Sequence, residues 1–353
     1  MTTMREVAQH AGVGLKTVSR VFNDDPHVGP ATRKRVQRSL RALNYVPNTL
    51  ARTFRTGKDP AVGVVVPDLT DPFFAAAIGA IESVAVPRQI AVVIAASGTD
   101  AEREQPTVES LLNRQIMGLI LTPTAPDQSY LSLWQGRTPL VFIDRTPAGV
   151  LADSFVEDDH GGAVLATSHL IGYGHRRIAC VGDDATIWTT RRRLAGYREA
   201  LAQAGIEAVP DWVLMGNWSV EDTTAALREL LRGPEAPTAL FSSNARCSTA
   251  VIPALQALRR TDVALVSFGD FPLAGALSPA LTVVDQDPHR LGLLAAERVF
   301  ARMDHPERRL RRKTVLPLRL ILRGSGEQPP PKPAGAPRRL APPRAPTDKR
   351  GKT

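Results

Sequence analysis

The chain has 353 residues, of which 43% are hydrophobic and 22% charged, a composition typical of globular proteins that excludes disorder throughout. This length predicts two or three domains. No window of about 18 apolar residues indicates a membrane span. The start MTTMREVAQH lacks the apolar core of a secretion signal, and two cysteines are too few for a disulfide framework or a thiolate metal site, so we expect a cytoplasmic protein.

Positive charge is concentrated at the two ends of the chain. Residues 1–58 hold eleven Lys/Arg and three Asp/Glu, a net charge of +8, and residues 326–353 carry +5. Because the whole chain carries +9, the 267 residues between them carry −4. A basic segment beside a mildly acidic body predicts a polyanionic partner for that segment, although a solubilising basic surface would have the same charge.

The first 46 residues predict three short helices. Thr3 and Glu6 fit a capping box at the start of the first helix, and Gly12 ends it. We expect the second helix over about Leu15–Phe22 and the third to open at Pro30, where the missing N–H costs little. Two short helices around a glycine-containing turn, packed on a third, form a helix-turn-helix.

An extended pattern of residues runs through this segment. It comprises Val7-Ala8, Ala11-Gly12-Val13, Thr17-Val18-Ser19-Arg20-Val21, Asn23, Thr32-Arg33, Val36 and Asn44-Tyr45-Val46-Pro47-Asn48. The pattern resembles the DNA-binding domain of the LacI/GalR family of bacterial transcription regulators, nearly without gaps through about Lys58. The resemblance implies a homodimer that binds a double-stranded DNA operator, with a helix-turn-helix domain over 1–46 and a hinge helix over 47–58.

The second helix carries the residues that the resemblance places on DNA. Leu15 and Lys16 stand at the two positions that read bases, where lysine can donate to guanine and leucine can contact a thymine methyl. The alternatives are a core role for Leu15 and a solvated Lys16. Arg20 is expected to contact a base or a phosphate, and Thr17 and Ser19 to hold phosphates.

The segment 48–56 resembles the family's hinge helix, which is too short to be stable alone. In the family, two copies pair over DNA and an apolar residue enters the minor groove between base steps. Phe54 stands at that position, where leucine is usual; the alternative is a linker helix that carries an aromatic residue. The DNA contacts expected here are Asn48, Leu50, Ala51, Arg52, Phe54 and Arg55.

From 59 to 325, short apolar runs alternate with helical patterns, which predicts an α/β fold with two doubly wound lobes. The expected strands are Val62–Val66, Ile90–Ala95, Gly118–Leu121, Leu140–Ile143, Ile178–Val181, Ala239–Phe241 and Val263–Ser267. The expected helices include Phe73–Val84, Gly161–Leu170, Leu194–Ala204, Val220–Leu231, Val251–Arg259 and Leu291–Met303. Ligands of such sheets bind beyond the carboxyl ends of the strands, here in a cleft between the lobes.

The resemblance continues through this body, more loosely. It is carried by the segments 62–68, 71–74, 169–171, 174–179, 193–197, 237–241 and 279–284, and by Asn244 and Gln286. It implies a periplasmic-binding-protein-like domain that binds a small-molecule effector. The effector contacts that we expect are Phe73, Phe74, Asp144, Trp188, Arg193, Trp218, Asn244 and Asp270.

Several of these side chains have two interpretations. Phe73 and Phe74 stack a ring or pack in the core, and Arg193 binds hydroxyls or a carboxylate or forms a structural salt bridge. The family's sugar-binding aspartate aligns with Gly269, one position before Asp270. This loss and the run Arg191-Arg192-Arg193 hint at an anionic effector, such as a sugar acid, rather than an ordinary hexose.

Residues 326–353 are rich in proline and arginine and predict a disordered basic tail, which either attracts DNA without reading it or has no function. The sequence contains no GxSxG, Walker, HExxH or CxxC motif. We therefore expect that the protein is not an enzyme and that it binds no cofactor or metal.

The sequence therefore predicts a sequence-specific transcription regulator, most consistent with a repressor controlled by a sugar or sugar-acid metabolite. The alternatives are a solute-binding protein with a basic extension and an effector-independent DNA-binding protein. The ordered pattern from Val7 to Phe54 argues against a mere extension.

Overall fold

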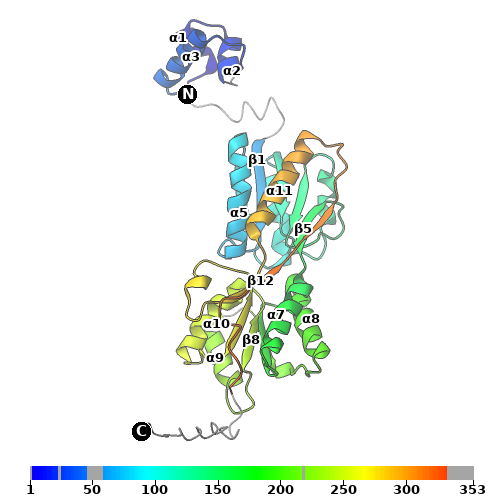
Figure 1. Ribbon diagram of the computed structural model, residues 1–353. Coiled ribbons are helices and arrows are strands. Elements are labelled where there is room, and N and C mark those ends of the chain that lie inside the picture. The colour runs from blue at the N-terminus through cyan, green and yellow to red at the C-terminus, as the bar shows by residue number, and fades with distance from the viewer. Residues whose placement is uncertain (1, 23–24, 46–58, 217–218, 332–353) are drawn as a thin grey trace, which may run out of the picture. The chain divides into compact units, whose positions relative to one another are not determined.

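The computed structural model describes residues 2–22, 25–45, 59–216 and 219–331. The chain divides into two compact units, Met1–Pro60 and Ala61–Thr353. Figure 1 shows the elements of both units. Among the described residues, no helix combines the length and the apolar character that crossing a membrane requires.

The smaller unit consists of three helices, as predicted. Its helices are α1 (Met4–Ala11), α2 (Leu15–Phe22) and α3 (Pro30–Ala42). The capping box is present: the Thr3 hydroxyl accepts from the Glu6 amide at 3.3 Å, and the Glu6 carboxylate accepts from the Thr3 amide at 2.8 Å. Gly12 ends α1 in the left-handed conformation (φ 58°) that glycine adopts without steric cost. Val7, Val18 and Val36, one from each helix, are fully buried and form the centre of the core.

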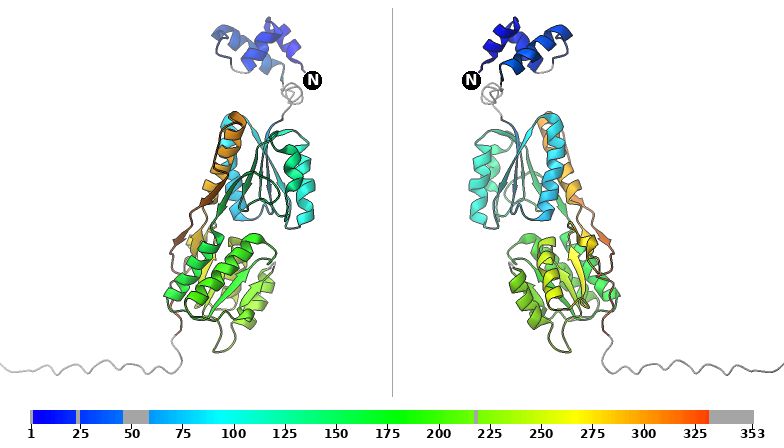
Figure 2. Two further views of the ribbon diagram at one scale, coloured as in Figure 1. Left: turned by 90° about the vertical axis from the view of Figure 1, so that its right-hand side faces the viewer. Right: turned by 90° about the vertical axis from the view of Figure 1, so that its left-hand side faces the viewer.

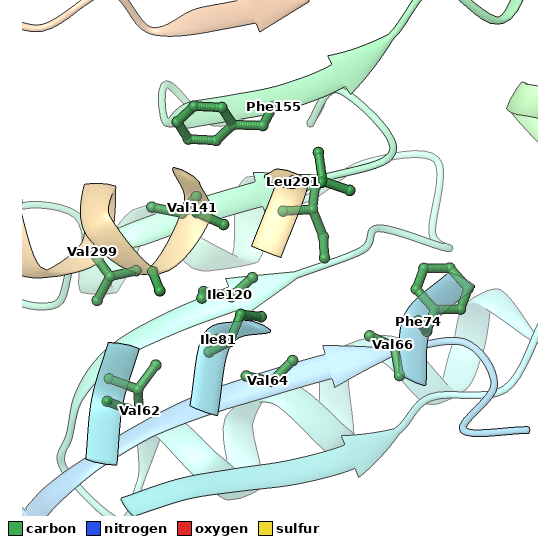
Figure 3. Packing of buried hydrophobic residues seen from close by; sticks show 14 of the residues in the cluster. Val62, Val64, Val66, Phe74, Ile81, Ile120, Val141, Phe155, Leu291 and Val299 are labelled. Carbon is green, nitrogen blue, oxygen red and sulfur yellow. The ribbon is translucent and has the colours of Figure 1, made fainter. Parts of the chain in front are cut away.

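The first lobe of the larger unit is a six-stranded sheet in the order β11-β5-β4-β3-β1-β2. Its strands are β1 (Asp59–Val66), β2 (Ala91–Ala96), β3 (Ile116–Leu121), β4 (Leu140–Ile143), β5 (Asp153–Glu157) and β11 (Lys313–Leu316). The helices α5 (Pro72–Ala85) and α11 (Pro288–Asp304) pack on one face and bury an aliphatic core (Figure 3). The other face is covered by α6 (Glu104–Leu112) and by a 3-10 helix over Ser129–Trp134.

The second lobe repeats this plan with the strand order β12-β10-β9-β8-β6-β7. Its strands are β6 (Ile178–Gly182), β7 (Val213–Met215), β8 (Ala239–Ser242), β9 (Ala264–Phe268), β10 (Thr282–Asp285) and β12 (Arg319–Ile321). The helices α7 (Asp159–Gly172) and α8 (Trp188–Gln203) cover one face, and α9 (Val220–Leu230) and α10 (Ala245–Ala257) cover the other (Figure 2). The doubly wound α/β architecture is therefore confirmed.

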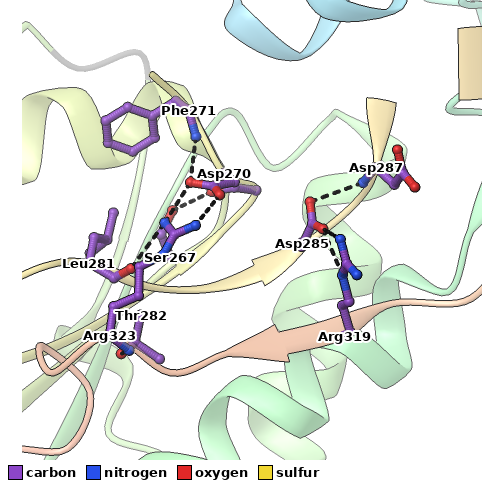
Figure 4. Close-up of polar contacts among 10 residues, drawn as sticks. Ser267, Asp270, Phe271, Leu281, Thr282, Asp285, Asp287, Arg319 and Arg323 are labelled. Atoms are coloured by element: carbon purple, nitrogen blue, oxygen red, sulfur yellow. Dashed lines mark hydrogen bonds and ion pairs between the residues drawn. The ribbon is translucent and has the colours of Figure 1, made fainter. Parts of the chain in front are cut away.

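Within the described residues, the chain passes between the lobes three times: from β5 into α7, from β10 into α11 and from β11 into β12. The second crossing begins at Asp285, at the end of β10, and the third ends at Arg319, at the start of β12. These two residues form an ion pair, in which Asp285 accepts from Arg319 at 2.8 Å (Figure 4). The strands that join the lobes thus lie next to charged side chains.

The expected strands and helices are present, but the sequence missed several elements. No strand was expected over β5, β7, β10, β11 or β12, because these segments are short or polar. The helix expected from Val251 begins six residues earlier, at Ala245, and contains Pro253. Asn244 caps this start by accepting from the Cys247 amide at 2.7 Å.

The beginning of the expected tail is also wrong, because the described body continues through Gly326 to Pro331. The Glu327 carboxylate lies 2.6 Å from His169 and accepts from the Thr282 hydroxyl at 2.7 Å. The imidazole of His175 is buried between Thr238 and the carbonyl of Gln328. These contacts with the second lobe hold a segment whose composition alone predicts disorder.

Candidate functional site

The N-terminal turn of α2 presents two side chains to solvent. Leu15 is 47% exposed and Lys16 is also exposed, whereas Val18 and Val21 further along the helix are buried. The helix starts after Gly14, whose carbonyl accepts from the Thr17 and Val18 amides. Leu15 therefore does not contribute to the core, and α2 offers one apolar and one cationic side chain side by side.

The remaining described residues expected on DNA lie on the same helix. Thr17 and Ser19 are half-buried, and Arg20 is exposed. The guanidinium of Arg20 lies 3.6 Å from the Asp25 carboxylate, which partly neutralises it. Outside the described residues lie Asn48, Leu50, Ala51, Arg52, Phe54, Arg55 and Trp218.

A small pocket with a cavity volume of about 50 Å³, here called the inner pocket, lies between the two lobes of the larger unit. The first lobe contributes side chains from the start of α5 and the end of β4, and the second contributes residues from the ends of β6, β8 and β10 and from α8. Carboxyl ends of strands are where such sheets bind ligands. Its walls are formed by Asp71, Phe73, Phe74, Asp144, Arg145, Asp183, Ile187, Thr189, Arg193, Asn244, Ala245 and Gln286.

The aromatic wall of the inner pocket is also part of the core of the first lobe. Phe73 and Phe74 are nearly buried, and their rings meet edge to face with centroids 5.1 Å apart. Both rings line the pocket and pack in the aliphatic core around β1 and α11. The two interpretations of these residues are therefore compatible.

Arg193 lines the inner pocket while it is held on three sides. Its Nε and Nη2 lie 2.8 and 2.7 Å from Asp159 Oδ1, and its Nη1 donates to the Ser243 carbonyl at 2.9 Å. The guanidinium also stacks on the Phe268 ring at 3.9 Å from its centroid. Arg193 and Asp159 are only 5% and 2% exposed, so this is a buried ion pair at the pocket wall.

A further carboxyl group, that of Glu157, lies near the pair of Arg193 and Asp159. Glu157, at the end of β5, is buried, and neither of its carboxyl oxygens has a hydrogen-bond partner among the described residues. Burial and the charges of Asp144 and Asp159 raise the pKa of Glu157 well above its usual value. Burial raises the pKa of Asp159 to about 6, although Arg193 opposes this shift. The region is therefore rich in acceptors and attracts hydrogen-bond donors.

On the other wall, Asp183 and Asn244 form a polar network. Asp183 accepts from the Asn244 amide at 2.5 Å and from Arg246 at 2.6 Å. Since Asn244 also caps α10, its side chain has a structural role at the site where a ligand contact was expected. Asp71 in turn caps α5, and its pKa is raised mainly by burial.

Two of the expected effector residues lie elsewhere. Asp270 does not line the inner pocket, and its carboxylate forms a two-pronged ion pair with Arg323 (Figure 4). Trp188 lines a second pocket with a cavity volume of about 570 Å³, here called the outer pocket, which shares Arg145 and Ile187 with the inner one. Its other lining residues are Thr99, Ala101, Pro123, Thr124, Ala125, Pro126, Gln128, Thr146, Ala148, Thr186 and Arg191.

The sequence missed much of the inner pocket. Asp71, Asp183 and Gln286 follow or precede secondary-structure elements, and strand ends are the signal by which the last two could have been found. Glu157 carries no such signal, because β5 itself was not expected. In the described part of the chain, no group of three or more His, Cys, Asp or Glu side chains is arranged to hold a metal ion.

Comparison with known proteins finds a matching family for a part of each unit. Residues 3–48 match the family described as bacterial regulatory proteins, lacI family, and residues 167–326 match the periplasmic binding protein-like domain. The ribose operon repressor of Escherichia coli K12 is 31% identical over 330 residues, which cover 92% of this chain and all of that protein.

Two solved structures are similar over the same share of the chain. The lac repressor dimer bound to operator and the anti-inducer ONPF has a TM-score of 0.78 at 26% identity, covering 92% of this chain and 99% of that one. The complex of the transcriptional regulator CelR with cellobiose has a TM-score of 0.65 at 31% identity, covering 92% of this chain and 100% of that one.

Proposed function

The chain belongs to the lacI family of bacterial regulatory proteins, and from this we propose that it is a homodimeric, sequence-specific transcription repressor controlled by a sugar. The observation that carries the proposal is the exposed pair Leu15 and Lys16 in the first turn of a helix that is anchored in the core by Val18 and Val21. A helix that reads base edges needs this arrangement. In the smaller unit, the described helices α2 and α3 also carry no acidic residue.

In this proposal the dimer binds a pseudo-palindromic operator, with one α2 in each of two successive major grooves. Lys16 donates to guanine and Leu15 contacts a thymine methyl, while Thr17, Ser19 and Arg20 contact phosphates. The hinge over 47–58 supplies Phe54 as the wedge in the minor groove. The relatives are repressors, and we infer that this protein likewise performs no catalysis and works in the cytoplasm.

For the effector we propose a polyhydroxylated, uncharged ring in the cleft that the inner and outer pockets form between the lobes. Three aspartates, Asp71, Asp144 and Asp183, line the inner pocket with Arg145 and Arg193. Ion pairs join Asp144 to Arg145, Asp183 to Arg246 and Asp159 to Arg193, which leaves Asp71 as the lining carboxylate without a paired cation among the described residues. Carboxylates accept hydrogen bonds from hydroxyl groups, and they repel an anionic ligand. The relatives named for a ribose operon and seen with cellobiose support a sugar.

The hint of an acidic effector that Arg191-Arg192-Arg193 gives is weakened by this geometry. Arg193 is committed to the ion pair, and Arg191 and Arg192 are exposed and absent from the inner pocket. Calorimetry with neutral sugars and with the corresponding sugar acids compares the two classes. Tight binding of the acids alone would refute the proposed class of ligand.

The experiment that tests DNA reading is selection of bound sequences from a random duplex pool with the full-length protein, with and without pooled sugars. We expect enrichment of a palindrome. Lys16→Ala should relax the preference at one position of each half-site by about 1–3 kcal/mol. Equal weakening on all sequences would make Lys16 a phosphate contact, and no enrichment under either condition would refute sequence-specific binding.

A further inference from the structure

The first lobe carries a cluster of cations in the loop that follows α11. Residues 304–313 have the sequence DHPERRLRRK, in which five Lys/Arg and two Asp/Glu give a net charge of +3, although residues 59–325 as a whole carry −4. The five basic side chains are all exposed and are here called the basic loop: Arg308, Arg309, Arg311, Arg312 and Lys313.

The charge of the basic loop is not neutralised within the described part of the chain. None of its five side chains makes a hydrogen bond or an ion pair with another described residue. The nearest acidic residues in the sequence have other partners, because Asp304 is paired with Arg88 at 2.9 Å and Glu307 lies 3.9 Å from His305. The basic loop therefore presents unpaired cations to solvent.

The backbone of the basic loop is nevertheless held in place by α11. Arg302 donates to the Arg308 carbonyl and Arg298 donates to the Arg311 carbonyl, both at 2.8 Å. Both α11 arginines are themselves paired with Asp153, so their own charge is balanced. The loop is thus shaped before a partner arrives, which lowers the entropic cost of binding. Replacing its side chains leaves these carbonyl contacts intact.

The basic loop lies at the edge of the sheet where the chain enters the first lobe. Strands β11, β5 and β4 are parallel, and the residues that follow β4 and β1 meet at the inner pocket. The starts of β11 and β1 therefore share the opposite edge, four strand spacings or about 19 Å apart. Figure 1 shows the end of α11 and the start of β1 at the same end of this lobe.

The same edge carries further cations and lies close to the DNA-binding unit along the chain. Arg114, before β3, and Arg137, before β4, are exposed there. Because β1 begins at Asp59, the 13 residues 46–58 connect this edge with the described helices of the smaller unit, a span of at most about 45 Å. A duplex bound by the smaller unit is therefore tethered near the basic loop at a high effective concentration.

The chemistry of the edge matches that of a DNA backbone. A duplex carries one negative charge per about 1.7 Å of its axis, so about eleven phosphates lie within the 19 Å between the starts of β11 and β1. Arginine binds phosphate oxygens with two parallel hydrogen bonds. A free acidic protein would match the charge as well, but it has no covalent tether to this edge.

Resting on the DNA-binding repressor proposed above, we propose that the basic loop is a second DNA-binding surface, which contacts backbone phosphates of the duplex that α2 reads. Such contacts position the protein and carry no sequence information. The larger unit then contributes to DNA affinity directly, and its contribution falls as the salt concentration rises.

The salt dependence of DNA binding tests this surface in the full-length protein. The test variant carries Arg308→Gln, Arg309→Gln, Arg311→Gln and Arg312→Gln, and the probes are the selected palindrome and a mixed-sequence duplex of the same length. We expect the affinity for both probes to fall at least about tenfold at 0.1 M salt. The slope of log K against log salt should become shallower by at least about 3.6, the value for four phosphate contacts per dimer.

Two further variants separate a local contact from a general loss of charge or of structure. The control carries four Arg→Gln changes at exposed positions of the second lobe, Arg198, Arg228, Arg232 and Arg259, and should keep the slope of the parent. Lysine at the four positions of the basic loop keeps the charge and should restore most of the affinity. Urea unfolding of all variants should match that of the parent, because the changed side chains are exposed.

The possible results distinguish this surface from the proposed function. If the test variant bound both probes as the control does, the surface would be overturned while the sequence-specific repressor stands. If no palindrome were enriched but the test variant still lost affinity for the mixed-sequence duplex, the surface would stand and sequence reading would be refuted. A parent protein that bound neither duplex would refute both.

Discussion

Replacing Arg193 with methionine tests whether this residue forms a buried structural ion pair or behaves as a solvated arginine. Methionine keeps the length of the side chain but leaves Asp159, which is 2% exposed, without its partner. Removing one member of a buried pair costs about 3–5 kcal/mol. The Ser243 carbonyl also loses its donor, which adds about 1 kcal/mol. We therefore expect Arg193→Met to lower the free energy of unfolding of the larger unit by about 4–6 kcal/mol at pH 7.5.

The loss should depend on pH in a defined direction. The folded pKa of Asp159 is about 6, above its usual 3.8, so this group destabilises the fold increasingly as pH rises toward 6. Because Arg193 lowers that pKa, its removal extends the loss to higher pH. The deficit of Arg193→Met should therefore grow above pH 6, by at most about 1.4 kcal/mol per pH unit.

Urea unfolding at pH 6 and pH 7.5, followed by tryptophan fluorescence, measures this deficit. All four tryptophans lie in the larger unit, so the signal reports that unit alone. Arg192→Met is the control, since Arg192 is exposed on the same helix and its replacement should cost less than about 0.5 kcal/mol. Adding Asp159→Asn to Arg193→Met should recover most of the loss. A deficit that matches that of Arg192→Met, or one that does not change with pH, would refute the reasoning.

Two further changes follow from buried residues. Val18→Ala removes two methyl groups from the centre of the three-helix core and should destabilise the smaller unit by about 2 kcal/mol. DNA binding should weaken, while urea unfolding of the larger unit should not change. A DNA affinity equal to that of the parent at 37 °C would contradict this prediction. Because the pKa of Glu157 is raised in the folded protein, ionisation of this carboxyl group destabilises the fold as pH rises above the usual pKa of 4.5. The stability of Glu157→Gln relative to the parent should therefore increase between pH 5 and pH 8, whereas that of the control Glu82→Gln, at an exposed position, should not. A difference that does not change with pH would contradict this assignment.

The smaller unit was predictable because its signals are local. Thr3 and Glu6 are three residues apart, Gly12 ends a helix by its own backbone conformation, and Pro30 begins the next one. Each signal acts within one turn of the chain, so no distant partner is needed to interpret it. The same holds for the apolar strands, such as β1 and β3, which are buried on both faces.

Strand β5 shows why the rest was not predictable. Its sequence DSFVE has a charged residue at each end, yet all five residues are buried. Asp153 is paired with Arg298 at 3.0 Å and with Arg302 at 2.7 Å, both on α11 and more than 140 residues away. Only these distant cations make burial of the carboxylate tolerable, and no local pattern announces them.

The site was partly predictable for the same reason. Strand ends identified Asp144 and Asn244, because the position of a residue after a strand is a local property. Asp270 is paired with Arg323, and Arg193 is paired with Asp159. Because these partners are distant in the sequence, the roles of Asp270 and Arg193 could be assigned only from the folded structure. Of the two roles predicted for Arg193, the salt bridge is present in the structure, and the ligand contact stays a prediction for a residue that lines the pocket.

The acidic residues beside the inner pocket also lie at the crossings between the lobes. Glu157 is the last residue of β5 in the first lobe, and Asp159 is the first residue of α7 in the second, so their repulsion acts across a crossing. Gln286, in the pocket wall, lies directly before the crossing into α11. A ligand that contacts Arg193 and Gln286 therefore acts within a few residues of two connections between the lobes. Its effect on their arrangement is limited to its difference in affinity for the two states, about 2.7 kcal/mol for a hundredfold shift.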